Sequence, residues 1–160
     1  MNLIIIFFAT NVFPISIAIF VLYVGYLWRK NKEKCLSLAR LSLISFPLTY
    51  LLAKIAGYII HDPRPFVVEH IKPLIAHAAD NGFPSDHTLL TSVIASVIYV
   101  YNKKLGMVLF VISIAIGSAR VLAGIHHPLD IVGAMVISIV AVYASWTLIQ
   151  RIKLLSKKKI

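Results

Sequence analysis

The sequence predicts an all-α integral membrane protein, a bundle of about five transmembrane helices in a single domain over residues 1–160. Of the 160 residues, 59% are hydrophobic and 14% are charged, and the mean hydropathy is +0.88. Soluble domains are about half apolar and about a quarter charged. A chain this short cannot bury so much apolar surface inside a water-facing globule, so we expect the excess to face lipid.

Five apolar segments divide the chain. A helix needs roughly 20 apolar residues to cross the hydrocarbon core of a bilayer. We expect spans over residues 3–28, 36–60, 88–101, 105–123 and 128–149. The third segment is short, but it can start at Ser85 with polar residues near the interface. The first segment has no basic leader and no small-residue cleavage site, so we expect a retained span rather than a signal peptide.

Most basic residues lie in three short runs between these segments. They are Arg29, Lys30, Lys32 and Lys34, then Lys103 and Lys104, then Arg151, Lys153 and Lys157 to Lys159. With five spans, all three runs fall on one side, which the positive-inside rule makes cytoplasmic. The C-terminus is then cytoplasmic, and the loops at 61–87 and 120–127 share the outer face. The net charge of +10 therefore indicates topology, and no basic face predicts a nucleic-acid partner.

The outer loops hold all six histidines of the chain and most of its other polar groups. The single cysteine, Cys35, excludes an internal disulfide and a multi-cysteine metal site. Polar residues in loops need no function, but charges at the ends of spans are usually retained for a purpose. Three clusters of residues on this face therefore need separate consideration.

The first cluster is Lys54 followed by Arg64-Pro65. Lys54 lies in the last turns of the second span, and Arg64 lies just beyond its end between two prolines that stiffen the chain. Two cations at one helix end suit a phosphate, and arginine can bind two phosphate oxygens at once. The alternative is that Lys54 snorkels to the interface and Arg64 is only an anchor.

The second cluster is Pro84-Ser85-Asp86-His87, where the third span begins. Ser85 is suited to the N-cap position of the helix, and a helix start offers free N–H groups to an anion. His87 falls in the first turn, from where it could protonate a leaving oxygen near neutral pH. The alternative is an ordinary capped helix with a surface histidine.

The third cluster combines Arg120, His126 and Asp130. Pro128 is suited to the first position of the last helix, so Asp130 occupies the third position and can reach back toward His126. A carboxylate on one ring nitrogen fixes the tautomer and leaves the other nitrogen as a nucleophile. Arg120 could neutralise the group under attack, whereas a simple capping aspartate would leave Arg120 unexplained.

Together the three clusters are typical of phosphoryl transfer, which needs neutralised charge, an activated nucleophile and a proton donor. The sequence has no carboxylate-rich pocket for magnesium, so we expect metal-independent chemistry without a cofactor. A histidine–zinc site is the main rival, although the arginines would be awkward neighbours for a second cation.

At these residues the sequence resembles the type 2 phosphatidic acid phosphatase (PAP2) superfamily. A Pro-Ser-x-His motif is matched by Pro84, Ser85 and His87, and an Arg-x5-His-x3-Asp motif by Arg120, His126 and Asp130. A Lys-x6-Arg-Pro motif is matched at Arg64-Pro65, but Gly57 stands at the expected lysine and Lys54 lies one helical turn earlier. Asp86 replaces the usual glycine of the second motif, and Ala119 the usual serine before the third.

The resemblance implies a role for each matched residue. It implies that His126 attacks phosphorus to form a phosphohistidine, that Asp130 orients it and that His87 protonates the leaving group. The residues implied to hold the phosphate are Lys54, Arg64, Ser85 and Arg120, with Asp86 and Pro84 as possible modulators.

The form of the second motif is similar to bacterial undecaprenyl-diphosphate phosphatases, which act on the outer face of the cytoplasmic membrane. We therefore expect a lipid phosphatase of the bacterial inner membrane whose partners are a lipid phosphate or diphosphate and the surrounding lipids. Phosphatidylglycerophosphate, phosphatidic acid and the 1-phosphate of lipid A remain alternative substrates. A soluble haloperoxidase of the same superfamily does not fit five spans, and a small transporter would need charges along its spans.

Overall fold

The computed structural model describes residues 1–157, and side chains as far as residue 155. The chain forms seven helices in this range and no named strand. They are α1 (Asn2–Thr10), α2 (Val12–Lys30), α3 (Lys32–Ile59), α4 (Pro65–Val68), α5 (Asp86–Tyr101), α6 (Lys103–Leu122) and α7 (Pro128–Lys157). The expected class, a helical bundle, is therefore confirmed. The end of the last basic run, residues 158–160, lies outside the described residues.

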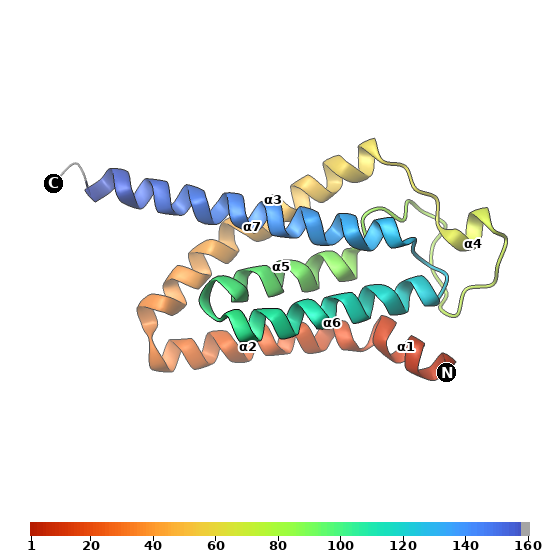
Figure 1. The fold of residues 1–160 in the computed structure, drawn as a ribbon, viewed down its shortest axis with the longest axis horizontal. Coiled ribbons are helices and arrows are strands. Elements are labelled where there is room, and N and C mark those ends of the chain that lie inside the picture. The colour runs from red at the N-terminus through yellow and green to blue at the C-terminus, as the bar shows by residue number, and fades with distance from the viewer. Residues whose placement is uncertain (158–160) are drawn as a thin grey trace.

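Helix α5 is the centre of the bundle and packs against α2, α3, α6 and α7 (Figure 1). The junctions α2–α3 and α5–α6 and the end of α7 lie at one end of the molecule. The N-terminus, the long loop that carries α4, and the α6–α7 turn lie at the other end. The described residues of the three basic runs thus lie at the end of the bundle opposite the loops that carry most of the predicted phosphate-binding residues.

Four helical segments are long and apolar enough to cross a membrane. They are Asn2–Lys30, Lys32–Ile59, Lys103–Leu122 and Pro128–Leu155. The expected third span, α5, has only 16 residues, and most of its side chains are buried by the surrounding helices. Large apolar side chains on the other helices, such as Leu22, Leu43 and Val111, are mostly exposed. An apolar exterior around a central helix is what a multi-pass membrane protein requires.

The first expected span is not one continuous helix, because the chain breaks at Asn11 between α1 and α2. Pro14 follows in the first turn of α2. Proline has no N–H to donate, and its ring clashes with the carbonyl four residues earlier, at Thr10. The Thr10 carbonyl therefore lacks its usual helical donor. The Thr10 hydroxyl donates to the Ile6 carbonyl, one turn earlier in α1, at 2.6 Å. The break turns α1 across the end of the bundle that carries the loops.

Candidate active site

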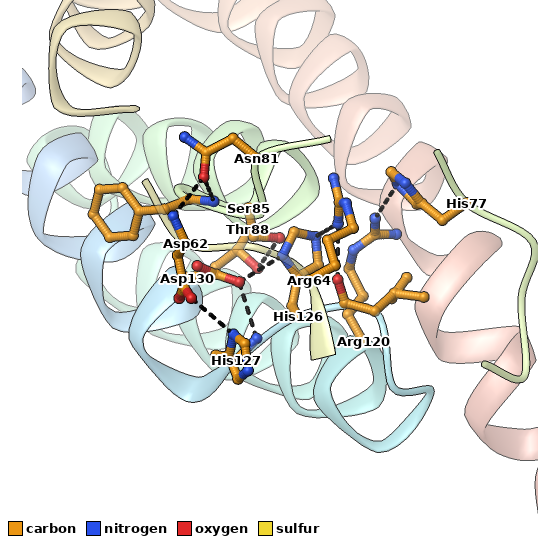
Figure 2. Close-up of polar contacts among 12 residues, drawn as sticks. Asp62, Arg64, His77, Asn81, Ser85, Thr88, Arg120, His126, His127 and Asp130 are labelled. Carbon is orange, nitrogen blue, oxygen red and sulfur yellow. Dashed lines mark hydrogen bonds and ion pairs between the residues drawn. The ribbon is translucent and has the colours of Figure 1, made fainter. Parts of the chain in front are cut away.

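Residues from each of the three predicted clusters meet at the end of the bundle where α5 begins and α6 ends (Figure 2). The loop before α5 and the turn before α7 bring in the remaining side chains. Arg64, Ser85, Arg120, His126 and Asp130 are all less than a tenth exposed. Burial of so many polar groups in so small a protein indicates a built site, because each must find a partner to offset the loss of water.

His126 and Asp130 form the most clearly defined pair in the site. As expected, α7 begins at Pro128 and Asp130 reaches back across its first turn. The Nδ1 atom of His126 lies 3.0 Å from Asp130 Oδ2, and the same oxygen accepts from the His127 backbone N–H at 2.9 Å. Because a carboxylate oxygen only accepts, the proton belongs on Nδ1 and the lone pair on Nε2.

The other nitrogen of His126 faces a guanidinium group. Nη1 of Arg64 lies 3.3 Å from Nε2 of His126, and arginine can only donate, which also assigns the lone pair to Nε2. Burial lowers the pKa of His126 below its ordinary value; the cations Arg120 and Arg64 lower it further, against the raising effect of Asp130. The imidazole is therefore neutral at neutral pH and available as a nucleophile.

Arg64 is held by two further hydrogen bonds. Nη1 also donates to the Ile125 carbonyl at 2.8 Å, and Nε donates to Asp80 Oδ1 at 2.6 Å. Partial burial raises the pKa of Asp80, but the hydrogen bond and charge of Arg64 outweigh it and hold that pKa below its ordinary value. The sequence did not single out Asp80, because nothing in its spacing from Arg64 shows that the loop folds back.

Arg120 projects from the last turn of α6 into the same space. Its Nη1 donates to the Ala9 carbonyl of α1 at 3.1 Å, and its Nη2 lies 3.5 Å from His77 Nε2. Its Nε is buried without a hydrogen-bond partner among the described residues. A buried cation with an unused donor is well prepared to bind an anion. His77, whose ring lies 6.3 Å from that of His126, is a second site residue that sequence reasoning did not single out.

The start of α5 closes the site from a third side. Ser85 occupies the N-cap position, as expected, but its side chain makes no capping hydrogen bond. Its hydroxyl instead accepts from Thr88 at 3.3 Å, and its backbone N–H donates to the Asp130 carbonyl at 3.2 Å. His87 lies in the first turn, with its ring centroid 4.7 Å from that of Phe13 in α2. The N–H groups of this turn point toward the site and favour a negative charge there.

Lys54 lies apart from this cluster. Its ammonium group sits 5.2 Å from the centre of the Tyr50 ring, and its side chain is exposed. It lines a cavity of about 370 Å³ together with Arg64, Asp86 and Pro84. The structure thus brings Lys54 and Asp86, both departures from the family pattern, to one cavity that shares Arg64 with the site.

Close packing explains why Gly57 stands where the family pattern has lysine. A Cβ atom at this position would lie 2.8 Å from the carbonyl oxygen of Phe83. Asn81 fixes that approach, because its amide donates to the Gly57 carbonyl at 2.7 Å and its oxygen accepts from the Phe83 N–H at 3.1 Å. A side chain at residue 57 would therefore displace the loop that leads into α5.

One group of residues has the composition of a metal site. Asp62, His127 and Asp130 each offer a ligand atom, and these atoms lie within 4.8 Å of one another. Groups of this composition are common in proteins without a metal ion, and two of these three residues already pair with each other. His127 Nδ1 already lies 3.1 Å from Asp62 Oδ1, the distance of an ion pair.

The profile of the PAP2 superfamily matches residues 38–154, which include every predicted site residue. The chain belongs to the PAP2 superfamily. Among solved structures, the chain resembles LpxE of Aquifex aeolicus with a TM-score of 0.73 and 26% identity, over 92% of this chain and 87% of that one. The predicted family and the predicted membrane fold are therefore both confirmed.

Two relatives carry the name BcrC. The chain is 34% identical over 128 residues to the bacitracin transport permease protein BcrC of Bacillus licheniformis, which is 79% of this chain and 62% of that protein. It is 39% identical over 79 residues to the undecaprenyl-diphosphatase BcrC of Bacillus subtilis, 49% of this chain and 41% of that protein. The chain thus spans less than two thirds of the length of either relative.

Proposed function

We propose that this PAP2 protein is a metal-independent membrane lipid phosphatase that forms a phosphohistidine on His126. Its first candidate substrate is undecaprenyl diphosphate, which it would convert to undecaprenyl phosphate. The observation that carries the proposal is the orientation of His126, with Nδ1 on the buried carboxylate of Asp130 and Nε2 facing Arg64. A neutral, oriented imidazole beside a cation is prepared to attack a phosphate whose charge that cation balances.

In the first step, Nε2 of His126 attacks the terminal phosphorus. The P–N bond forms as the bond from phosphorus to the leaving oxygen breaks, and the protonated ring of His87 gives its proton to that oxygen. Burial and then the charge of Arg120 lower the pKa of His87 to about 4 in the free site, so the negative charge of the bound phosphate must raise that pKa before His87 acts as the acid. Arg64, Arg120 and the first N–H groups of α5 hold the phosphate oxygens, with the Ser85 hydroxyl beside them. The positive charge that develops on the His126 ring is balanced by Asp130.

In the second step, water attacks the phosphohistidine. His87, now neutral, takes a proton from the water as the new P–O bond forms and the P–N bond breaks. Inorganic phosphate leaves, and His126 regains its free Nε2. Arg120 assists both steps from the same place, because the transferred group keeps its negative charge throughout.

The choice of a lipid diphosphate as substrate rests on the similarity to the B. subtilis relative, which is named undecaprenyl-diphosphatase. Phosphatidylglycerophosphate, phosphatidic acid and lipid A 1-phosphate present the same terminal phosphate and are the alternative substrates. The three basic runs lie opposite the site, so the proposed orientation places the site on the outer face of a bacterial cytoplasmic membrane and the C-terminus inside.

Transport is the second candidate function, because the B. licheniformis relative is named as a transport permease. Carriers and channels bind their cargo at polar groups within the spans. In the described part of this chain, the buried charged residues Arg64, Arg120 and Asp130 instead gather at one end of the bundle. Phosphate transfer therefore accounts for them better than a path across the membrane does.

Phosphate release from four lipids tests the proposal directly. The purified protein in detergent, with excess chelator, is given undecaprenyl diphosphate, phosphatidylglycerophosphate, phosphatidic acid or lipid A. We expect the fastest release from undecaprenyl diphosphate and none from a folded His126→Ala variant. Preference for another lipid would keep the chemistry and change the substrate. Release that persists in His126→Ala, or that is absent from every lipid, would overturn the proposed function.

A further inference from the structure

The carboxyl group of Asp62 occupies the side of Asp130 that faces away from His126. Asp62 lies in the loop after α3, and Figure 2 shows its side chain beside Asp130 and His127. Its Oδ1 is 3.1 Å from His127 Nδ1. The proposed chemistry assigns no role to either Asp62 or His127, although both contact the residue that orients the nucleophile.

One oxygen of Asp130 lacks a donor. Asp130 is fully buried, and its Oδ2 accepts both from His126 and from the His127 N–H. Its Oδ1 is buried with no hydrogen-bond partner among the described residues. A buried oxygen without a donor destabilises the folded protein, so a neighbouring group is expected to donate to it. The neighbouring carboxyl group of Asp62 is a donor only if it carries a proton.

The chain holds Asp62 at this place by its backbone on both sides. The Asp62 N–H donates to Asn81 Oδ1 at 2.9 Å, and the Asp62 carbonyl accepts from the Gly82 N–H at 2.8 Å. A Cβ atom on Gly82 would lie 3.1 Å from that carbonyl and 3.0 Å from Asp130 Oδ2. The close approach of the two carboxyl groups therefore depends on a glycine and an asparagine that pin the loop against α7.

We propose that Asp62 is a positioning residue that shares a proton with Asp130, donating to Oδ1 while its other oxygen lies at ion-pair distance from His127. This inference rests on the proposed function of the site. It defines a row of neighbouring polar groups, His127, Asp62, Asp130 and His126, in which the two carboxyl groups together carry one negative charge. A second negative charge would draw a proton onto Nε2 of His126, and that proton would remove the lone pair that attacks phosphorus.

The electrostatic surroundings agree with the geometry. The titratable groups that face Asp62 are Asp130 at the start of α7 and His127 in the turn before it. Burial raises the pKa of Asp62, Asp130 raises it further, and His127 lowers it. Two carboxyl groups this close bind a proton more tightly than either would alone.

The test compares Asp62→Asn with Asp62→Ala in the lipid phosphatase assay. The amide of asparagine can donate to Oδ1 and its oxygen can accept from His127, whereas alanine does neither. We expect Asp62→Ala to lower kcat at least tenfold with little change in KM, and Asp62→Asn to restore most of that loss. Glu69→Gln, an exposed carboxyl change in the same loop, is the matched control and should equal the wild type.

The pH profile distinguishes positioning from simple structure. The wild type loses the shared proton as pH rises, but an amide does not, so the ratio of kcat for Asp62→Asn to kcat for the wild type should rise with pH. The ratio for Glu69→Gln should stay flat. If Asp62→Ala fails to fold, which its thermal midpoint in detergent would show, the profile of Asp62→Asn alone decides.

Three results would overturn the inference. If kcat of the Asp62→Asn variant is as low as that of Asp62→Ala, the ionised carboxylate is required. A flat ratio would mean that no proton is shared. Wild-type activity lost in chelator and restored by Zn²⁺ would assign Asp62, His127 and Asp130 to a cation instead. That last result would also remove the metal independence of the proposed function. In the other two cases the proposed function stands or fails separately, because it is judged by wild-type turnover against His126→Ala.

Discussion

Nη1 of Arg64 lies 3.3 Å from Nε2 of His126, so the proposed nucleophile and its nearest cation are in direct contact. The guanidinium is fixed in this position by the Ile125 carbonyl and the Asp80 carboxylate. A phosphate that approaches Nε2 must therefore meet Arg64 at once. We therefore expect the contact to orient the substrate for attack and to keep a proton off Nε2.

Replacement of Arg64 by lysine should remove this arrangement while keeping the charge. A lysine ammonium cannot hold the carbonyl, the carboxylate and a phosphate in one plane, as the guanidinium fork does. We expect kcat/KM to fall roughly 100-fold, the usual cost of one lost transition-state donor. Steady-state kinetics with undecaprenyl diphosphate measure the loss. A change of less than threefold would show that Arg64 supplies charge alone.

Asp130→Asn should abolish most turnover and leave the protein folded. The amide keeps the size of the side chain, but its NH2 group can donate to Nδ1 of His126 and so favour the tautomer with the proton on Nε2. That tautomer has no lone pair facing phosphorus. We expect kcat to fall about 10³-fold or more, as for other carboxylates that orient a histidine. Normal activity in a folded Asp130→Asn variant would contradict the tautomer assignment.

The acid side of the pH profile reports the protonation of His126. Burial and the two arginines lower the pKa of this residue, so Nε2 stays unprotonated below the ordinary value of about 6.5. As pH falls, kcat/KM should therefore decline only through a pKa below about 6.5. Arg64→Met removes one of the lowering charges and should move the decline to higher pH. An unmoved decline would assign it to another group.

Introducing the lysine of the family pattern at Gly57 should harm this protein. A Cβ atom there meets the Phe83 carbonyl at 2.8 Å, and backbone fixed by Asn81 cannot easily move away. We expect Gly57→Lys and Gly57→Ala to destabilise the fold by about 1–3 kcal/mol, the usual cost of overpacking. Thermal unfolding in detergent measures the change.

Gly25 provides the matched control for that prediction. It lies within α2, and a Cβ atom on it would meet nothing within 4 Å. Gly25→Ala should be neutral or stabilise the helix by about 0.5–1 kcal/mol, because alanine is the better helix residue. Equal thermal midpoints for Gly57→Lys and Gly25→Ala, with higher activity in Gly57→Lys, would show that a lysine fits at residue 57.

The sequence predicted the parts of the site whose geometry is local. Asp130 reaches His126 across one helical turn, and Pro128 marks where that turn begins, so spacing alone was sufficient. Ser85 was correctly placed at the start of α5, but its hydroxyl bonds to Thr88 rather than to the backbone. The bundle followed in the same way from five apolar segments, each of which forms helix.

Contacts between distant segments could not be predicted from spacing. The pairing of Arg64 with Asp80 and of Arg120 with the Ala9 carbonyl depends on how the loop and α1 fold over the end of the bundle. The break at Asn11 that brings α1 there had a local signal, the proline three residues later, but hydropathy alone gave one continuous span. The close approach of the Phe83 carbonyl likewise explains why residue 57 is a glycine. The motif comparison showed only that the usual lysine is missing there.

Lys54 and Asp86 line one cavity with Arg64, and among the described residues no hydrogen bond or ion pair joins either of them to His126, so we expect their effects to fall on binding rather than on the chemical step. Lys54→Met removes a positive charge beside the cavity and should raise KM for undecaprenyl diphosphate several-fold with little change in kcat. Asp86→Gly restores the usual glycine, removes a negative charge and should lower KM. An interaction made equally before and at the transition state changes KM alone.

The double variant Lys54→Met, Asp86→Gly measures whether the two charges act together. If both act on the same phosphate through the cavity, their effects on KM should partly cancel, because one change removes attraction and the other removes repulsion. Lys72→Met, which removes an exposed cation in the loop between α3 and α5, is the control and should leave KM unchanged. If Lys54→Met lowers kcat 100-fold instead, Lys54 contacts the transferred phosphate itself, and the lysine of the first motif is functionally present one turn early.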